Sequence, residues 1–173
     1  MAPANPVPQS ARIIRATHDD IHRIESMITA AFTKYIERIG KPPAPMLANY
    51  NELIKTHDVY VLQDTDASNT GRRGIVQGSI VLETHDESNA LELSSLVVDP
   101  AAQGRGYGRL LIEFAEERAR VQGRSTLTLY TNVKMFENLG LYRKLGFLEV
   151  GRRVQDGYER VFFRKGISST TAG

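Results

Sequence analysis

The sequence of 173 residues has no cysteine, almost no net charge and no long apolar segment. The absence of cysteine excludes a disulfide framework, a thiolate metal site and a cysteine nucleophile. The 22 Lys and Arg residues nearly balance the 20 Asp and Glu residues, and a net charge of +2 does not favour nucleic acid or a membrane surface as a partner. No apolar run approaches the ~20 residues that a membrane-spanning helix needs. The remaining composition, 41% hydrophobic and 24% charged, is typical of one globular domain.

The two ends of the sequence differ from its middle. Residues 1–10 hold three prolines and no apolar block long enough for a signal peptide, so we expect them to be disordered. We expect the same of residues 167–173, which are mostly Ser, Thr and Gly. No period of 20 to 50 residues repeats between them. The sequence therefore predicts a single domain over residues 11–166.

Hydrophobic periodicity predicts an α+β fold. Helices are expected over residues 21–39, within 46–56, around 108–118 and over 135–144, and strands over 12–15, 59–62, 75–83, 90–98, 126–130, 147–150 and 158–164. Thr17 and Asp20 have the spacing of a capping box before the first helix, and Gly40 ends it. The predicted order is β-α-α-β-β-β-α-β-α-β-β. Because it contains one β-α-β unit, we expect a mixed, mostly antiparallel sheet flanked by helices.

A glycine-rich turn joins the strand over 90–98 to the helix that follows it. Gly104, Gly106 and Gly108 allow close approach to the backbone, and Arg105 and Arg109 add positive charge. The N–H groups at the start of a helix bind anions, so a pyrophosphate is the expected ligand. Two nucleotide patterns do not fit, because a P-loop needs Gly-Lys-Ser/Thr and the dinucleotide motif needs glycine at position 109. A glycine-rich turn without a ligand is the alternative.

Two motifs resemble those of the GNAT superfamily of N-acetyltransferases. The segment Gln103-Gly104-Arg105-Gly106-Tyr107-Gly108 resembles the family signature Q/R-x-x-G-x-G/A, and Leu141-Tyr142-Arg143-Lys144-Leu145-Gly146-Phe147 resembles its L-Y-x-x-L-G-F helix end. The order of both motifs and of the predicted elements also resembles the family, over about residues 12–165. The resemblance implies a single GNAT-like domain that uses acetyl-CoA as its cosubstrate.

The resemblance also implies where acetyl-CoA binds. The pyrophosphate would rest on the backbone amides of the glycine-rich turn, and the pantetheine arm would pair like an extra strand with the end of the 90–98 strand. An amide there, that of Val98, would polarise the thioester carbonyl, an effect of ~3 kcal/mol for such donors. The usual asparagine seven residues before the helix tyrosine is replaced by Met135, and we expect Asn138 to substitute for it, with Asn132 as the alternative. The implied binding residues are Leu96, Val97, Val98, Gln103, Gly104, Arg105, Gly106, Tyr107, Gly108, Arg109 and Asn138.

Two residues are candidates for proton transfer. Tyr142 matches the tyrosine that family members place near the thioester sulfur, where a phenol can act as general acid. A half-buried core tyrosine is the alternative. Glu92 is our candidate base for the acceptor ammonium, because its position before Gln103 is similar to that of a glutamate base in the histone-acetyltransferase branch. Its alternative is a solvent-facing or arginine-paired strand glutamate. His18 and His22 have a metal-compatible spacing, but we interpret them as a surface pair and expect no metal.

The predicted function is an acetyl-CoA-dependent N-acetyltransferase. Because no cysteine is present, an acyl-cysteine intermediate is excluded, and direct transfer to a bound primary amine is expected. A small-molecule acceptor is favoured, with a protein lysine or N-terminal amine as one alternative and a non-catalytic CoA-binding module as another. Residues 41–46 fall where family members build the acceptor wall, although a plain turn also explains their prolines. We expect a cytoplasmic protein without nucleic-acid or membrane partners, and the family also allows a homodimer.

Overall fold

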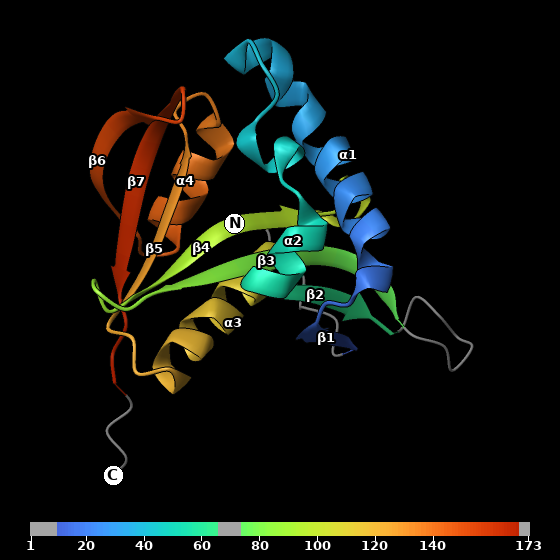
Figure 1. Ribbon diagram of the computed structural model, residues 1–173, viewed down its shortest axis with the longest axis horizontal. Helices are drawn as coiled ribbons and strands as arrows, with labels where there is room; N and C mark the ends of the chain where they lie inside the picture. Colours follow the sequence, from blue (N-terminus) through green and yellow to red (C-terminus); the bar gives the residue numbers. More distant parts are fainter. Residues whose placement is uncertain (1–9, 66–73, 170–173) are drawn as a thin grey trace.

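One mixed sheet of seven strands forms the centre of the protein (Figure 1). The computed structural model describes residues 10–65 and 74–169. The strands are β1 (Ala11–Arg15), β2 (Asp58–Asp64), β3 (Ile75–His85), β4 (Ala90–Val98), β5 (Thr126–Asn132), β6 (Leu148–Gln155) and β7 (Tyr158–Gly166). They lie in the order β1-β2-β3-β4-β5-β7-β6, and every neighbouring pair is antiparallel except β4 and β5. The predicted fold class is confirmed.

Four helices cover the sheet: α1 (Ile21–Ile39), α2 (Tyr50–Thr56), α3 (Tyr107–Val121) and α4 (Phe136–Lys144). Buried side chains of α1 and α2, such as Ile24 and Tyr50, belong to one apolar cluster. Those of α3 and α4, such as Leu111 and Leu139, belong to a second cluster. Figure 1 shows α1 and α3 on opposite sides of the central strands. The two helix layers thus cover both faces of the central strands β2 and β3, whose residues are mostly buried, whereas β6 is mostly exposed.

The first helix begins and ends at the expected residues. Thr17 donates its N–H to Asp20 Oδ2 at 2.8 Å, which forms the predicted capping box, although a short 3-10 turn separates it from α1. Gly40 has a φ of 89°, the left-handed conformation that ends a helix and favours glycine. The second helix, α2, is shorter than the range 46–56 within which it was predicted, because a 3-10 turn over Ala44–Leu47 precedes it. Asn49 caps α2 by accepting the N–H of Glu52.

A β-bulge in β4 lies close to the place where β4 and β5 stop pairing. Val81 pairs with Ser95 and Leu82 with Leu93, so Ser94 is an extra residue between them. An extra residue reverses the alternation of side chains, and Leu93 accordingly packs in the α3 cluster whereas Val97 packs in the α1 cluster. The parallel pairing of β4 with β5 stops near the same place, at Leu93 and Leu129, although both strands continue to Val98 and Asn132. Beyond this point the two strands diverge.

The predicted flanking segments lie mostly outside the described residues. Ser10, which we assigned to the first of them, donates from Oγ to Asp64 Oδ1 at 2.8 Å. Ile167, assigned to the second, donates its N–H to the carbonyl of Ser125 at 2.8 Å and packs against the core. Ser10 and Ile167 thus both contact the domain. Across these described residues no helix has both the length and the apolar character needed to cross a membrane.

Candidate active site

A cavity of about 290 Å³ lies where β4 and β5 diverge. Its walls come from Glu92 to Leu96 on β4, from Tyr130 to Asn132 on β5, and from α1, α2, α4, β3 and β7. Pro43, Ala44 and Pro45 add an apolar side, which agrees with the acceptor wall that the resemblance implied for residues 41–46. Glu92 and Tyr142, the two candidate catalytic residues, both line this one cavity.

Glu92 faces the cavity with a mostly buried carboxylate. Its side chain is 23% exposed, and its Oε2 lies 3.6 Å from Nε2 of His85. Burial raises the pKa of Glu92, and the nearby carboxylate of Glu83 raises it further, whereas His85, Arg160 and His57 oppose the rise. A carboxyl group with a raised pKa is a stronger base once ionised, which suits proton abstraction near neutral pH.

The surroundings of Glu92 were not anticipated from the sequence. Glu83 is the direct cross-strand partner of Glu92, and like charges at such positions repel. His57 Nε2 lies 3.2 Å from Glu83 Oε2, so each carboxylate has an imidazole beside it. The residues come from α2's end, β3 and β4, and only the pairing of the strands brings them together. The predicted strand ended at Glu83, and the structure extends β3 by two residues to include His85.

Three of these groups have the composition of a cation site. The ligand atoms of Glu83, His85 and Glu92 lie within 4.8 Å of one another. Two carboxylates and one imidazole could hold a divalent cation. All three side chains are partly exposed, however, and such groups often occur without an ion. We therefore assign the cluster no metal role.

Tyr142 lies on α4 with its ring in the core. The ring packs against Phe147 and Phe163, with centroids 5.9 and 5.7 Å away. Burial raises the pKa of the Tyr142 phenol to about 12, with a smaller contribution from Tyr35. The phenol therefore keeps its proton throughout the neutral range. The Tyr142 side chain is buried in the core and also forms part of the cavity wall. A core tyrosine and a tyrosine that faces the reaction site are therefore compatible descriptions of it.

Asn138 and Met135 also line the cavity. Asn138 Nδ2 lies 3.6 Å from the Met135 sulfur, a weak contact that leaves its amide available for a stronger acceptor. Asn132, the alternative, accepts the N–H of Lys134 with its side-chain oxygen at 2.9 Å. Both asparagines line the cavity, and Asn138 as the replacement for the usual asparagine stays a prediction.

The glycine-rich turn at the start of α3 has the backbone geometry expected of an anion cradle. Gly104 and Gly106 have φ values of 82° and 83°, a region that other residues adopt at a cost. By helix geometry the N–H groups of Tyr107, Gly108 and Arg109 have no acceptor within α3. A Cβ on Gly108 would meet only Val98 Cγ2, at 4.0 Å, so the fold itself has room for a side chain there. Helix-start N–H groups with no side chain at Gly108 suit the pyrophosphate that the sequence predicts.

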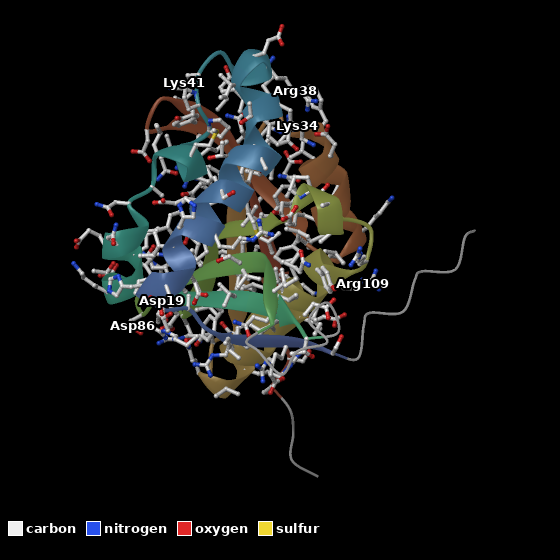
Figure 2. All side chains as sticks on the ribbon, turned by 90° about the vertical axis from the view of Figure 1, so that its right-hand side faces the viewer. Asp19, Lys34, Arg38, Lys41, Asp86 and Arg109 are labelled. Carbon is white, nitrogen blue, oxygen red and sulfur yellow. The ribbon has the colours of Figure 1, made fainter. Side chains whose placement is uncertain are left out.

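The arginines of the turn are exposed, as phosphate-binding arginines need to be. Figure 2 shows Arg109 on the outside of the molecule. Gln103 is also exposed, and its Nε2 donates to the carbonyl of Val98 at 3.4 Å. Tyr107 differs from its neighbours, because its side chain is buried and its hydroxyl donates to Asp64 Oδ2 at 2.6 Å. Only the backbone of Tyr107 can therefore contribute to the cradle.

The expected pantetheine path runs along β4 between the cavity and the cradle. Leu96 lines the cavity, whereas Val97 is buried against α1 and Val98 lies beside Gly108. Because the pairing of β4 with β5 ends at Leu93, the edge of β4 from Ser94 onward faces the opening. An extended chain could pair there like an added strand.

An ion pair that the sequence analysis missed attaches the cradle to α1. Arg23 pairs with Asp99, and its Nε donates to the carbonyl of Val76 at 3.0 Å. Asp99 Oδ1 in turn accepts the N–H of Ala101 at 2.9 Å, at the start of the glycine-rich turn. The first helix thus orients the segment between β4 and α3. A separation of 76 residues between Arg23 and Asp99 explains why no local pattern indicates the contact.

Comparisons with known proteins agree with the resemblance. A family model described as an acetyltransferase (GNAT) domain matches residues 55–149. The chain is 38% identical over 80 residues to the IAA acetyltransferase of Azospirillum brasilense, a match that covers 46% of this chain and 52% of that protein. It is 32% identical over 117 residues to the N-alpha-acetyltransferase RimI of Mycobacterium tuberculosis, covering 66% of this chain and 68% of that one.

The match thus spans about half the length of the first of these relatives and two thirds of the second. Among solved structures, nourseothricin acetyltransferase aligns with a TM-score of 0.67 at 19% identity, covering 92% of this chain and 100% of that chain. At this level of identity the alignment shows a shared fold.

Proposed function

Because this chain belongs to the GNAT family of acetyltransferases, we propose that it transfers the acetyl group of acetyl-CoA directly to a primary amine of a small molecule. The observation that carries the proposal is the cavity at the divergence of β4 and β5, which Glu92 and Tyr142 both line. A volume of about 290 Å³ is at the small end of ligand sites. That volume supports a small acceptor over a folded protein surface.

The glycine-rich turn and the free edge of β4 would hold acetyl-CoA. The N–H groups of the first turn of α3, with Arg105 and Arg109, would bind its phosphates, and Leu96 to Val98 would hold its arm. Asn138 would contribute a side-chain amide from α4. When bound, acetyl-CoA supplies a thioester, whose acetyl group is transferred and whose sulfur leaves as a thiolate that needs a proton.

The protein's part of the chemistry is to move two protons. An aliphatic amine is mostly protonated at neutral pH, so it must lose a proton before it can attack. Glu92, ionised above its raised pKa, would accept that proton directly or through water. Tyr142 Oη, which keeps its own proton up to a pKa of about 12, would pass that proton to the leaving sulfur and then regain one from water. The two groups thus hold opposite protonation states in one cavity.

A thiol-release assay tests the proposed function. The protein is incubated with acetyl-CoA and a panel of small amines, amino acids and short peptides, and the free thiol is measured together with binding of acetyl-CoA by calorimetry. We expect at least one small amine to release thiol well above the blank. Binding without any acceptor would support the CoA-binding module instead, and a preference for peptides would support a protein or N-terminal acceptor.

Replacing Glu92 with glutamine should lower kcat/KM about tenfold at neutral pH and shift the pH optimum upward. In the parent protein kcat/KM rises with pH as Glu92 loses its proton, so the acidic limb follows its raised pKa. In Glu92→Gln that limb is absent, and the rate follows the pKa of the free amine. Rates measured across the pH range check this. An unaltered pH profile would remove Glu92 from the role of base.

The same substitution should raise thermal stability above neutral pH. Because the pKa of Glu92 is raised in the folded protein, ionisation of Glu92 lowers the free energy of unfolding. The loss is complete at every pH above that raised pKa. Glutamine removes this cost and the repulsion by Glu83, a gain of up to about 1 kcal/mol or about 2–4 °C in Tm. Calorimetry at pH 8 and at pH 4 measures it, and the gain should vanish at the lower pH, where the carboxyl is protonated.

Two expectations from the sequence stay predictions. We expect a cytoplasmic location, because the proposed reaction uses acetyl-CoA. A homodimer is common in the family, and size-exclusion chromatography with light scattering would measure the mass in solution.

A further inference from the structure

Arg160 of β7 is a buried cation in the wall of the cavity. Its side chain is only 6% exposed, and it lines the same cavity as Glu92. The guanidinium carbon lies 4.1 Å from the ring centroid of Tyr130 and 5.7 Å from that of Tyr158, so two aromatic rings fix its position. A buried charge is costly unless other groups pair with it. The partners of Arg160 therefore indicate what the site is built to bind.

Ion pairing within the protein compensates the charge of Arg160 only weakly. Among residues 10–65 and 74–169, the one ion pair of Arg160 joins its Nη1 to Oδ2 of Asp156, at 3.2 Å. Asp156 lies in the turn between β6 and β7, and its side chain is 74% exposed. Because water surrounds the Asp156 carboxylate, its attraction for the guanidinium is weakened. Because a guanidinium has five N–H donors, most of its hydrogen-bonding capacity remains for a group inside the cavity.

A second cation lies at the same end of the cavity. Lys41, which follows α1, has its Nζ 4.0 Å from the ring centroid of Tyr158 and donates to the carbonyl of Gly157 at 2.7 Å. Figure 2 shows Lys41 beyond the end of α1. Tyr158 thus has Arg160 and Lys41 beside its ring, and Arg160 is the cation that itself lines the β7 end of the cavity.

The β3–β4 end of the cavity has the opposite charge. Glu83 and Glu92 line it, as direct cross-strand partners. Within the described part of the chain, no ion pair closer than 4.0 Å joins either carboxylate to Arg160. The cavity therefore presents separate negative and positive groups to one small ligand. An acceptor that carries both an ammonium and a carboxylate matches this arrangement.

We propose that the acceptor is an amino acid whose carboxylate binds to Arg160 while its amine lies toward Glu92. The planar guanidinium matches a carboxylate with two parallel hydrogen bonds, which a lysine cannot reproduce. The apolar side formed by Pro43, Ala44 and Pro45 then contacts the remainder of the acceptor. This assignment rests on the proposed function, because it names the class of acceptor for the same cavity.

Matched acceptors test the assignment. Initial rates are measured for amino acids and for their carboxamides, which keep the amine and the side chain but lose the negative charge. We expect kcat/KM to be at least tenfold higher for the amino acids. In Arg160→Gln this preference should disappear through a rise in KM for the amino acids. Arg160→Lys should recover only part of the preference.

Arg153→Gln is the matched control. Arg153 lies on β6, where its guanidinium is 3.6 Å from the ring centroid of Phe162, and it does not line the cavity. It should leave the acceptor preference unchanged. Binding of acetyl-CoA and the Tm of each variant report whether the fold is intact. If Arg160→Gln does not fold, the parent's preference for carboxylates over carboxamides and the Arg160→Lys variant still decide the assignment.

The outcomes separate this inference from the proposed function. Carboxamides that react as well as amino acids would overturn the inference while acetyl transfer stands. A uniform loss of kcat in Arg160→Gln, with the preference intact, would overturn it too, because that pattern indicates a structural role. If no acceptor reacts at all, the proposed function fails, and calorimetric titration with amino acids in the presence of CoA still measures the site. Binding lost at least tenfold in Arg160→Gln would support the carboxylate site, and no binding to the parent would contradict it.

Discussion

Replacing Gly108 with glutamate should weaken the binding of acetyl-CoA at least a hundredfold while leaving the protein folded. The new carboxylate would lie in the first turn of α3, among the N–H groups that we assign to the pyrophosphate. Two unit charges about 4 Å apart near a protein surface repel by about 4 kcal/mol, which exceeds a hundredfold in Kd. A negative side chain at a helix N-terminus and the loss of a helical glycine both favour folding.

Two smaller substitutions at the same position separate charge from size. Gly108→Gln adds a side chain of the same length without the charge and should weaken binding less than glutamate does. Gly108→Ala places one methyl group where the fold has room, and the family signature accepts alanine there, so its Kd should stay within a few-fold of the parent value. Calorimetric titration with acetyl-CoA measures all three. If Gly108→Glu binds acetyl-CoA with the same Kd as Gly108→Ala, the glycine-rich turn is not the phosphate site.

Removing the hydroxyl of Tyr142 should lower kcat about a hundredfold without weakening acetyl-CoA binding. Phenylalanine keeps the ring contacts with Phe147 and Phe163, so packing and the free energy of unfolding should change little. What is lost is a proton donor in the cavity, and such groups typically contribute 10²- to 10⁴-fold to the rate. Steady-state rates with a saturating acceptor, together with the Kd for acetyl-CoA, measure the effect.

Tyr50→Phe is the control for that experiment. Tyr50 also lines the cavity and is also buried, but its hydroxyl contacts Ser95 Oγ at 3.4 Å and lies on the α1 side of the sheet. We expect its kcat to stay within about threefold of the parent value. Equal losses in both variants would indicate a general effect on the cavity. An unchanged kcat in Tyr142→Phe would exclude Tyr142 as the proton donor.

The parts of the fold that depend on local sequence could be predicted. The capping box at Thr17, the helix end at Gly40 and the glycine-rich turn each act within a few residues, and the structure has all three where they were expected. Element order followed from hydrophobic periodicity. The bulge at Ser94 could not be predicted, because a serine between strand residues has no distinctive pattern and its extra position exists only relative to β3.

The surroundings of the candidate catalytic residues also escaped the sequence analysis. Glu83 meets Glu92 through an antiparallel pairing, and Arg160 reaches the cavity because β7 lies beside β5 and not beside β6 alone. Sequence motifs pointed to Tyr142 and to the glycine-rich turn, because each motif lies within a short stretch of chain. Acceptor recognition depends on side chains from strands that are distant in sequence, and only the assembled sheet relates them.

The most direct test of acetyl transfer follows the acetyl group itself. The protein is mixed with acetyl-CoA labelled with carbon-13 in the acetyl group and with an amino acid acceptor, and mass spectrometry is applied to the acceptor and to the intact protein. We expect labelled N-acetyl amino acid, one CoA thiol released for each amide formed, and no label retained on the protein. Label held on the protein, or thiol released without an acetylated amine, would contradict direct transfer to a bound amine.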